Sequence, residues 1–185
     1  RSDTEGQPDI TLDGTKEDYE KLRKQYPHLS IEECEYSCAG AEFYMKLLKH
    51  QGFMIHASAV EKEGKAYLFS APSGTGKSTH AQLWRQTFKG EPIRIINDDK
   101  PAVCLQNGVF YACGTPFSGK TDKNENRKAP IQGLCMLHRG KTNKIQKITS
   151  GEALPLILPQ TLFYGDEEET NLLLSFLDRF LQSVP

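Results

Sequence analysis

A glycine-rich stretch in the middle of the chain reads Ala71-Pro72-Ser73-Gly74-Thr75-Gly76-Lys77-Ser78. It follows the apolar run Tyr67-Leu68-Phe69, which is typical of a buried strand, and a helical pattern over 77–88 comes after it. The pattern is [Ala/Gly]-x4-Gly-Lys-[Ser/Thr], with Ala71 where the strict form has glycine. A strand, a glycine-rich turn and a helix in this order predict a phosphate-binding loop.

The residue types in this stretch suit the chemistry of a phosphate. Small residues let the backbone N–H groups wrap around an anion, and the N-terminus of the following helix attracts negative charge. We expect Lys77 to bind the β- and γ-phosphates and the Ser78 hydroxyl to bind Mg²⁺. The alternative is a glycine-rich turn without a ligand. The predicted cofactors are ATP, or another nucleoside triphosphate, and Mg²⁺, held by Ser73, Gly74, Thr75, Gly76, Lys77, Ser78 and Thr79.

Two adjacent carboxylates, Asp98 and Asp99, follow the next apolar run, Ile93–Asn97. Two such side chains cannot both be buried without partners except at a large cost in free energy. A magnesium ion together with a proton-acceptor role explains the pair. One aspartate would coordinate the metal and the other would accept the proton of a substrate hydroxyl. The alternative is a polar turn after a strand.

Three further side chains are candidates for the site. His56 lies inside an apolar run over 53–60, where a histidine is more commonly a structural residue of the sheet than a catalytic one. Lys120 and Arg127 lie in a polar loop over 114–127 and are candidates for binding substrate or the transferred phosphate. Cationic side chains in such loops are also commonly just solvated.

The remaining pattern predicts hairpins more often than strand–helix–strand units. Helices are expected over 40–51, 77–88, 151–158 and 170–182. Strands are expected over 53–60, 65–70, 93–97, 101–106, 109–113, 131–138 and 144–148. Asn107-Gly108 is the strongest turn signal, because both residue types tolerate a positive φ. We therefore predict an α/β fold of α+β-like character, with a mixed, largely antiparallel sheet and flanking helices.

The length of 185 residues suits a single domain. Within it we expect a polar and helical N-terminal region over 1–52, a nucleotide-binding core over 53–158 and a C-terminal helix over 159–185. The chain begins without methionine, and an apolar helical pattern runs up to its last residues. We therefore leave open whether it extends further at either end.

The composition excludes some classes of partner. Of the residues, 37% are hydrophobic and 25% are charged, and the formal net charge is −1. This charge argues against nucleic-acid binding through a strong basic field, and no apolar run is long enough for a membrane span. Residues 1–10 are polar and do not read as a signal peptide. We expect a cytoplasmic protein that binds neither nucleic acid nor a membrane.

The cysteines are odd in number, and three of them lie in apolar, strand-like runs. This usage predicts reduced thiols and argues against a disulfide framework. Cys34 and Cys38 could share a helical face, but no second Cys or His pair gives the spacing of a zinc site. The five are Cys34, Cys38, Cys104, Cys113 and Cys135.

These features in this order resemble the catalytic domain of the HPr kinase/phosphorylase family, which shares a fold with the ATP-dependent phosphoenolpyruvate carboxykinases. The similar part covers about 53–158. The stretch Gly114-Thr115-Pro116-Phe117-Ser118-Gly119-Lys120 resembles a compact, single-domain branch of these kinase-like proteins. The other motifs are His56 with Ser58 as His-Ala-Ser, the loop Ser73–Ser78, and the pair Asp98-Asp99.

The resemblance implies a P-loop kinase domain and assigns roles to its residues. Lys77 would bind phosphate, and Ser78 and Asp99 would hold magnesium. Asp98 would be the base that activates a substrate hydroxyl, with His56 nearby. Family members assemble into oligomers, so the resemblance also makes a homo-oligomer a possible state.

The chain departs from the family at one motif and in its length. HPr kinases carry Glu-Ile-Arg-Gly, where the glutamate assists at the metal, and the nearest stretch here is Pro130-Ile131-Gln132-Gly133. Recognition of the HPr protein is therefore not carried over. True carboxykinases are far longer and bring separate substrate residues, so their chemistry is not expected.

Three functions are compatible with this sequence. The first is a Mg²⁺-dependent, ATP-binding kinase that transfers the γ-phosphoryl group to a hydroxyl of a small molecule or to a serine of a peptide or protein. The second is a nucleotide-binding regulatory module without phosphotransfer, which the missing glutamate favours. The third is phosphorolysis or hydrolysis of the nucleotide. The sequence specifies neither the acceptor nor the choice between ATP and GTP.

Overall fold

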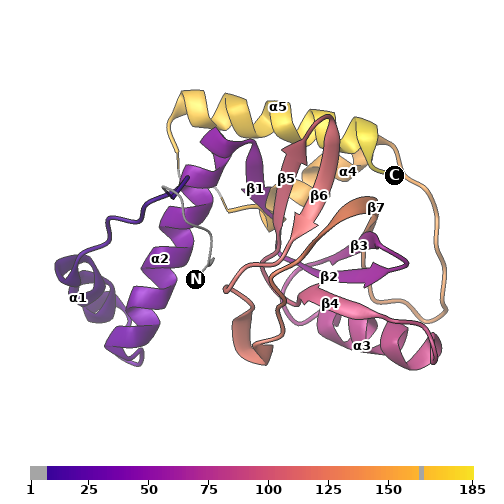
Figure 1. The fold of residues 1–185 in the computed structure, drawn as a ribbon, viewed down its shortest axis with the longest axis horizontal. Coiled ribbons are helices and arrows are strands. Elements are labelled where there is room, and N and C mark those ends of the chain that lie inside the picture. Colours follow the sequence, from indigo (N-terminus) through magenta and orange to yellow (C-terminus); the bar gives the residue numbers. More distant parts are fainter. Residues whose placement is uncertain (1–7, 163–164) are drawn as a thin grey trace.

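The computed structural model describes residues 8–162 and 165–185 (Figure 1). Within these ranges, one sheet has the strand order β1-β5-β6-β7-β3-β2-β4. Only the β3–β7 pair is parallel among the described strands, and the other pairs are antiparallel. The prediction of a mixed, largely antiparallel sheet is confirmed. The strands are β1 (Gly52–Met54), β2 (Ala57–Lys62), β3 (Lys65–Ser70), β4 (Arg94–Asn97), β5 (Ala102–Gln106), β6 (Val109–Cys113) and β7 (Lys128–Met136).

Strand β7 joins two parts of the sheet. Its first residues, Lys128–Pro130, pair with β6, and its later residues, from Ile131 to Met136, pair with β3. The register between β3 and β7 shifts between Ala66 and Tyr67, so the sheet is irregular at this point. As a result, the β1-β5-β6 part lies to one side of β7 and the β3-β2-β4 part lies to the other (Figure 1).

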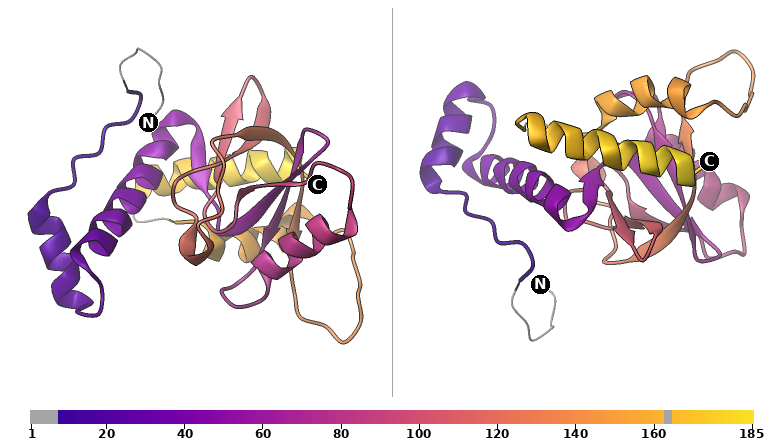
Figure 2. Two further views of the ribbon diagram at one scale, coloured as in Figure 1. Left: turned by 60° about the horizontal axis from the view of Figure 1, so that its bottom comes forward. Right: turned by 90° about the horizontal axis from the view of Figure 1, so that it is seen from above.

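Helices cover the sheet on different sides. Apolar residues of α5 pack with α4 residue Ile157 and with strand residues such as Phe53 and Phe110 in the largest core cluster. Ala81 and Trp84 of α3 pack on β2, β3 and β4, away from α5 (Figure 2). The helices are α1 (Lys16–Gln25), α2 (Ile31–Leu47), α3 (Lys77–Thr87), α4 (Ser150–Ile157) and α5 (Glu167–Ser183), with 3-10 turns η1 (Leu48–His50), η2 (Gly119–Thr121) and η3 (Leu158–Gln160).

Helices α1 and α2 form a hairpin that extends from the sheet (Figures 1 and 2). Both begin with a capping box, in which Thr15 and Asp18 cap α1 while Ser30 and Glu33 cap α2. The predicted helix over 40–51 is therefore only the second half of a longer one that starts at Ile31. Among the described residues of α1, none is buried, whereas the C-terminal half of α2 packs on the sheet.

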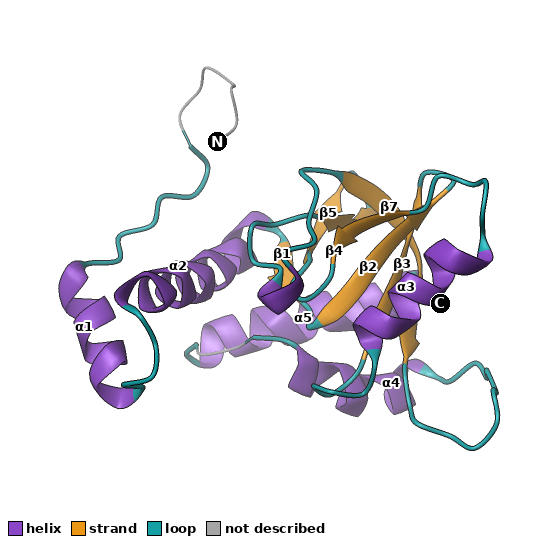
Figure 3. Ribbon diagram, turned by 90° about the horizontal axis from the view of Figure 1, so that it is seen from below, coloured by secondary structure: helices purple, strands orange, loops and turns teal. Residues whose placement is uncertain are grey.

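Two strand predictions are wrong. The run over 53–60 forms two separate strands, because the chain leaves β1 after Met54, and β2 pairs with β3 and β4 instead of continuing beside β5. The expected strand over 144–148 lies in the loop that joins β7 to α4 (Figure 3), and Ile145 is 89% exposed. An isolated apolar residue without a partner strand gains no burial there.

The other predicted elements are present with small differences at their ends. They include α3, α4, α5, β3, β4 and the β5–β6 hairpin with its Asn107-Gly108 turn.

None of the helices in the described part of the chain has the length and apolar character needed to cross a bilayer.

Candidate functional site

The glycine-rich stretch connects the end of β3 to the start of α3, as the sequence predicted. Gly74 and Gly76 have φ values of 75° and 118°, which residues with a Cβ rarely adopt, and a Cβ on either would meet no atom within 4 Å. Gly76 is the N-cap residue of α3. The loop therefore has an open face at a helix N-terminus, where an anion is stabilised.

Lys77 lies under this loop with its ammonium group directed at the loop backbone. Its Nζ donates to the carbonyl of Ala71 at 2.9 Å and lies 3.5 Å from that of Pro72, and only 7% of the residue is exposed. Burial lowers the pKa of Lys77 below its usual value. The charges of Asp99 and Asp98 raise this pKa, but their effect is smaller than that of burial. The lysine and the two aspartates therefore belong to one electrostatic cluster.

Asp98 lies at the end of β4 and is 3% exposed. Its Oδ1 accepts a hydrogen bond of 2.6 Å from the Ser58 hydroxyl of β2. Its Oδ2 is buried and has no hydrogen-bond partner among the described residues. Such an atom costs free energy unless a ligand, a water molecule or an ion supplies the missing partner.

Asp99 is held by two cationic or potentially cationic groups. Its Oδ1 lies 3.2 Å from Nε2 of His56, and its Oδ2 pairs with Nζ of Lys100. Burial by itself raises the pKa of the Asp99 carboxyl, but the hydrogen bonds from His56 and Lys100 outweigh it and bring the pKa down to about 2. Asp99 is therefore a carboxylate at neutral pH.

The break between β1 and β2 positions His56. The residue lies between the two strands, and its backbone N–H donates to the carbonyl of Gln160 at 2.7 Å. Its Nδ1 lies 3.2 Å from Oε1 of the same glutamine. Gln160 thus fixes both the backbone and the ring of His56, and the other ring nitrogen faces Asp99.

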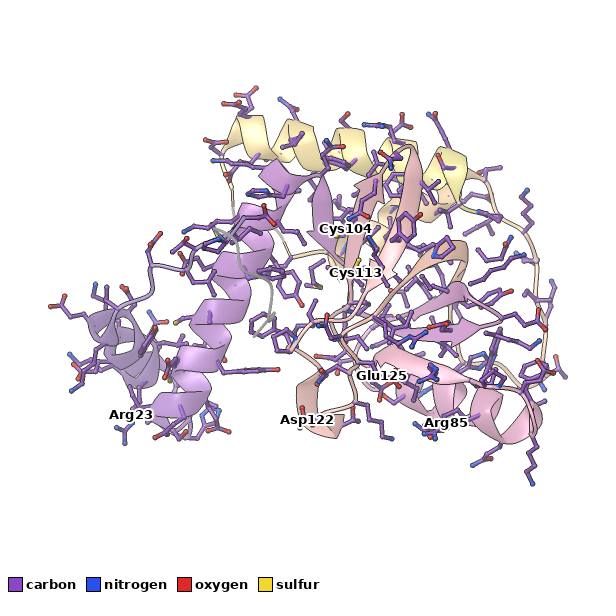
Figure 4. All side chains as sticks on the ribbon, in the orientation of Figure 1. Arg23, Arg85, Cys104, Cys113, Asp122 and Glu125 are labelled. Atoms are coloured by element: carbon purple, nitrogen blue, oxygen red, sulfur yellow. The ribbon has the colours of Figure 1, made fainter. Side chains whose placement is uncertain are left out.

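A loop over 114–125 covers the turn that carries the aspartates. The Asp98 N–H donates to the carbonyl of Lys123 at 3.0 Å, and Gly119 lies against Asp99, so that a Cβ there would be 2.8 Å from the Asp99 Cγ. Figure 4 labels Asp122 and Glu125 in this loop. The Asn97 side chain donates to the carbonyl of Thr115 and accepts from the N–H groups of Asp99 and Lys100.

Helix α2 holds the same loop from the other side. The Tyr36 hydroxyl donates to the carbonyl of Pro116 at 3.0 Å and accepts from the N–H of Ser118 at 3.2 Å. Phe117 packs against Gly40, where a Cβ would approach the ring to 3.0 Å. Through these contacts, α2 of the N-terminal hairpin holds the loop over 114–125.

Of the two cationic candidates in the polar loop, the structure gives side-chain contacts for Arg127 only. Arg127 forms an ion pair with Glu61 of β2, with Nε–Oε2 and Nη2–Oε1 distances of 2.8 and 3.1 Å. None of its described hydrogen bonds or ion pairs reaches the glycine-rich loop. The backbone of Lys120 lies in η2, and its side chain lies outside the described part of the structure.

The sequence reasoning missed several residues that build the site. Gln160, Asn97 and Tyr44 each make hydrogen bonds that bridge segments far apart in the chain. Lone polar residues of this kind carry no local signal, because their roles depend on long-range packing. Arg139, whose Nη2 donates to the carbonyl of Gly74 at 2.6 Å, also gives no signal in its own neighbourhood.

The candidate metal ligands at this site are side-chain oxygens. Among the described residues, no group of three or more His, Cys, Asp and Glu side chains is arranged to hold a metal. Mg²⁺ is bound through one or two protein oxygens together with phosphate and water. Ser78 at the start of α3 and Asp99 after β4 carry side-chain oxygens of this kind.

Two of the five cysteines lie close to each other in the sheet. Cys104 and Cys113 are on the neighbouring strands β5 and β6, and their side chains approach each other (Figure 4). A hydrogen bond in which the Cys104 thiol donates to the Cys113 sulfur raises the pKa of Cys104 and lowers that of Cys113. All five cysteines are free thiols, and Cys34 is buried in α2.

No protein-family profile matches the chain, and no curated protein matches it. The Hpr(Ser) kinase/phosphatase from Coxiella burnetii is similar over 70% of this chain and 96% of that chain, at 13% identity and a TM-score of 0.36. The proposals for this chain therefore rest on its own residues.

Proposed function

We propose that this chain is a Mg²⁺-dependent, ATP-binding kinase that transfers the γ-phosphoryl group to a hydroxyl of a small molecule or to a serine of a peptide or protein. The observation that carries the proposal is the buried, unpartnered Oδ2 of Asp98 in one electrostatic cluster with Lys77 of the glycine-rich loop. An acceptor hydroxyl that donates to this oxygen would supply its missing partner.

The glycine-rich loop and Lys77 would bind the phosphates. Backbone N–H groups of the loop and the N-terminus of α3 would hold the β-phosphate, while Lys77 would release its carbonyl partners and pair with the β- and γ-phosphates. The charge of Lys77 would stabilise the transition state more than the ground state, because negative charge develops on the phosphate during transfer and the cation is already in place.

Asp98 would act as the general base. Its Oδ2 would take the proton of the acceptor hydroxyl while the acceptor oxygen forms a bond to the γ-phosphorus. The bond from that phosphorus to the bridging oxygen would break, and ADP would leave. The Ser58 hydroxyl of β2 holds Oδ1 of this carboxylate, so Oδ2 is the oxygen left for the acceptor.

Ser78 and Asp99 would hold the magnesium ion, which when bound neutralises charge on the β- and γ-phosphate oxygens. Asp99 suits this role because its low pKa keeps it ionised. His56 would position Asp99, since it contacts the carboxylate with one ring nitrogen and Gln160 with the other. Asp98 and Asp99 thus have separate roles set by their different partners.

Transfer of labelled γ-phosphate from ATP into a panel of metabolites and peptides tests the proposal. We expect wild-type protein to label an acceptor, and Lys77→Ala and Asp98→Asn to lower the rate by about 10²–10³-fold, the usual effect of losing one transition-state contact. Asp178→Asn is the matched control, because Asp178 is an exposed carboxylate on α5. Full transfer by Lys77→Ala or Asp98→Asn would contradict the mechanism.

A nucleotide-binding regulatory module is the second candidate. The observation that favours it is the sequence Pro130-Ile131-Gln132-Gly133 in β7, which lacks the glutamate that assists at the metal in HPr kinases. Binding of Mg²⁺–ATP without any ADP formed across the same acceptor panel would support the module and contradict the kinase. Phosphate-dependent release of pyrophosphate would instead indicate phosphorolysis.

A further inference from the structure

A hollow of about 420 Å³ lies beside the glycine-rich loop. One wall is formed by Thr79, His80 and Leu83 of α3, and the other by Leu137, His138 and Arg139, which follow β7. Gly74, Thr75 and Gly76 form the edge that the hollow shares with the loop. The volume falls in the range of about 300–1,000 Å³ that is usual for small-molecule pockets.

The orientation of the bound triphosphate determines which part of the nucleotide would lie in this hollow. Lys77 and the aspartates mark the end where the γ-phosphate would lie, and neither Asp98 nor Asp99 lines the hollow. Thr79 lies further along α3 than Lys77 and does line it. A triphosphate bound with its γ-phosphate at the aspartates would therefore direct its α-phosphate, and whatever is attached to it, toward the hollow.

The walls have the chemistry that suits a flat, partly polar ring. Leu83 is 49% exposed although it is apolar, and Leu137 on the facing wall packs against the core cluster around α3. The His80 ring is fixed against Phe69, with 4.4 Å between the ring centroids. Burial lowers the pKa of His80, which favours its neutral form. A planar base between the leucines would bury apolar surface that water now contacts.

Arg139 connects the hollow to the loop. Its Nη2 donates to the carbonyl of Gly74 at 2.6 Å, and the residue lines the hollow. The guanidinium therefore lies at the junction between the phosphate-binding backbone and the apolar walls, where a ribose or an α-phosphate would pass.

We infer that this hollow binds the base and ribose of the nucleotide, so that the chain recognises a nucleoside triphosphate and not merely a polyphosphate chain. The inference rests on the proposed function, because it needs a triphosphate on the glycine-rich loop. Leu83 is the residue that contributes binding energy for the nucleoside without contacting the phosphates.

The test compares two ligands, ATP and inorganic tripolyphosphate, each with Mg²⁺, by calorimetry. Leu83→Gln keeps a helix-forming residue of similar length at an exposed position, so we expect it to fold. It should weaken ATP binding by about tenfold and leave tripolyphosphate binding within about twofold of wild type. Leu174→Gln is the matched control, since Leu174 is an exposed leucine of α5 at 37% exposure, and it should change neither affinity.

The variant Leu156→Gln tests whether the nucleoside binds in a different hollow. Leu156 of α4 lines a second hollow of about 310 Å³, between the loop and η3. If Leu156→Gln and not Leu83→Gln weakened ATP binding, the inference would be overturned. Equal affinity of wild-type protein for ATP and tripolyphosphate would also overturn it, while leaving the phosphate loop intact. Binding of neither ligand by wild-type protein would instead overturn the proposed function, and the inference with it.

Discussion

Ser58 donates a hydrogen bond of 2.6 Å to Oδ1 of Asp98, and Oδ2 of the same carboxylate is buried without a partner. The pair joins β2 to the end of β4, the edge strand that lies beside it in the sheet. A buried acceptor without a partner destabilises a fold by about 1–3 kcal/mol. The arrangement therefore fixes one oxygen and leaves the other ready for a ligand that donates a proton.

Ser58→Ala should destabilise the protein by about 1–3 kcal/mol, because it removes the only side-chain partner that the described structure gives to Asp98. The free energy of unfolding in urea measures this change. Ser37→Ala is the control, since the Ser37 hydroxyl bonds only to a carbonyl of its own helix at an exposed position. Equal stability of the two variants would show that the Ser58 hydrogen bond does not hold the buried carboxylate.

Asp99 should make stability depend on pH. The pKa of Asp99 is about 2 in the folded protein, compared with 3.8 for an unperturbed aspartate. Its contribution to the free energy of unfolding is therefore fully present above about pH 4 and is lost as the pH falls toward 2. The shift corresponds to about 2 kcal/mol. The difference in unfolding free energy between wild type and Asp99→Asn, measured in urea, should therefore be about 2 kcal/mol at pH 6 and close to zero at pH 2. A difference that did not change between these pH values would contradict the ion pairing of Asp99.

Gly119→Ala should disturb Asp99 directly. A Cβ at this position would lie 2.8 Å from Cγ of Asp99, and the φ of 64° is unfavourable for alanine. Gly108→Ala is the matched control, because Gly108 has a φ of 79° and a Cβ there would meet nothing within 4 Å. Both variants should lose about 1 kcal/mol from backbone strain.

Gly119→Ala should lose a further 1–3 kcal/mol, roughly the usual effect of overpacking, and should lower phosphotransfer as well. Thermal unfolding and the transfer assay measure these two effects. If the two glycine variants behaved alike in both measurements, the loop over 114–125 would not pack on Asp99 as described.

Much of the fold was predictable because its signals are local. The Asn107-Gly108 turn specified the β5–β6 hairpin, and the apolar stripe of α5 specified a helix that covers the sheet. The break between β1 and β2 was not predictable, since residues 53–60 form one continuous apolar run. The two strands separate because they pair with different neighbours, β5 in one case and β3 with β4 in the other, and such pairing depends on distant residues.

The candidate site was predictable in its residues more than in its connections. The glycine-rich loop, Asp98 and His56 follow local patterns, and the structure places His56 beside Asp99. The supporting contacts from Gln160 and from Tyr44 were not predictable, because they join segments more than 50 residues apart. The expected strand over 144–148 does not form, for a related reason. A strand needs a neighbouring strand to pair with, and the local sequence does not show whether one is present.

Calorimetric titration of wild-type protein and Lys77→Ala with Mg²⁺–ATP tests most directly whether the loop at 71–78 binds a nucleoside triphosphate. We predict that wild type binds and that Lys77→Ala, with its fold checked by circular dichroism, binds at least tenfold more weakly, since one buried charge-assisted contact contributes about 1.5–3 kcal/mol. Equal affinity of the two proteins, or the absence of binding by wild type, would contradict the account.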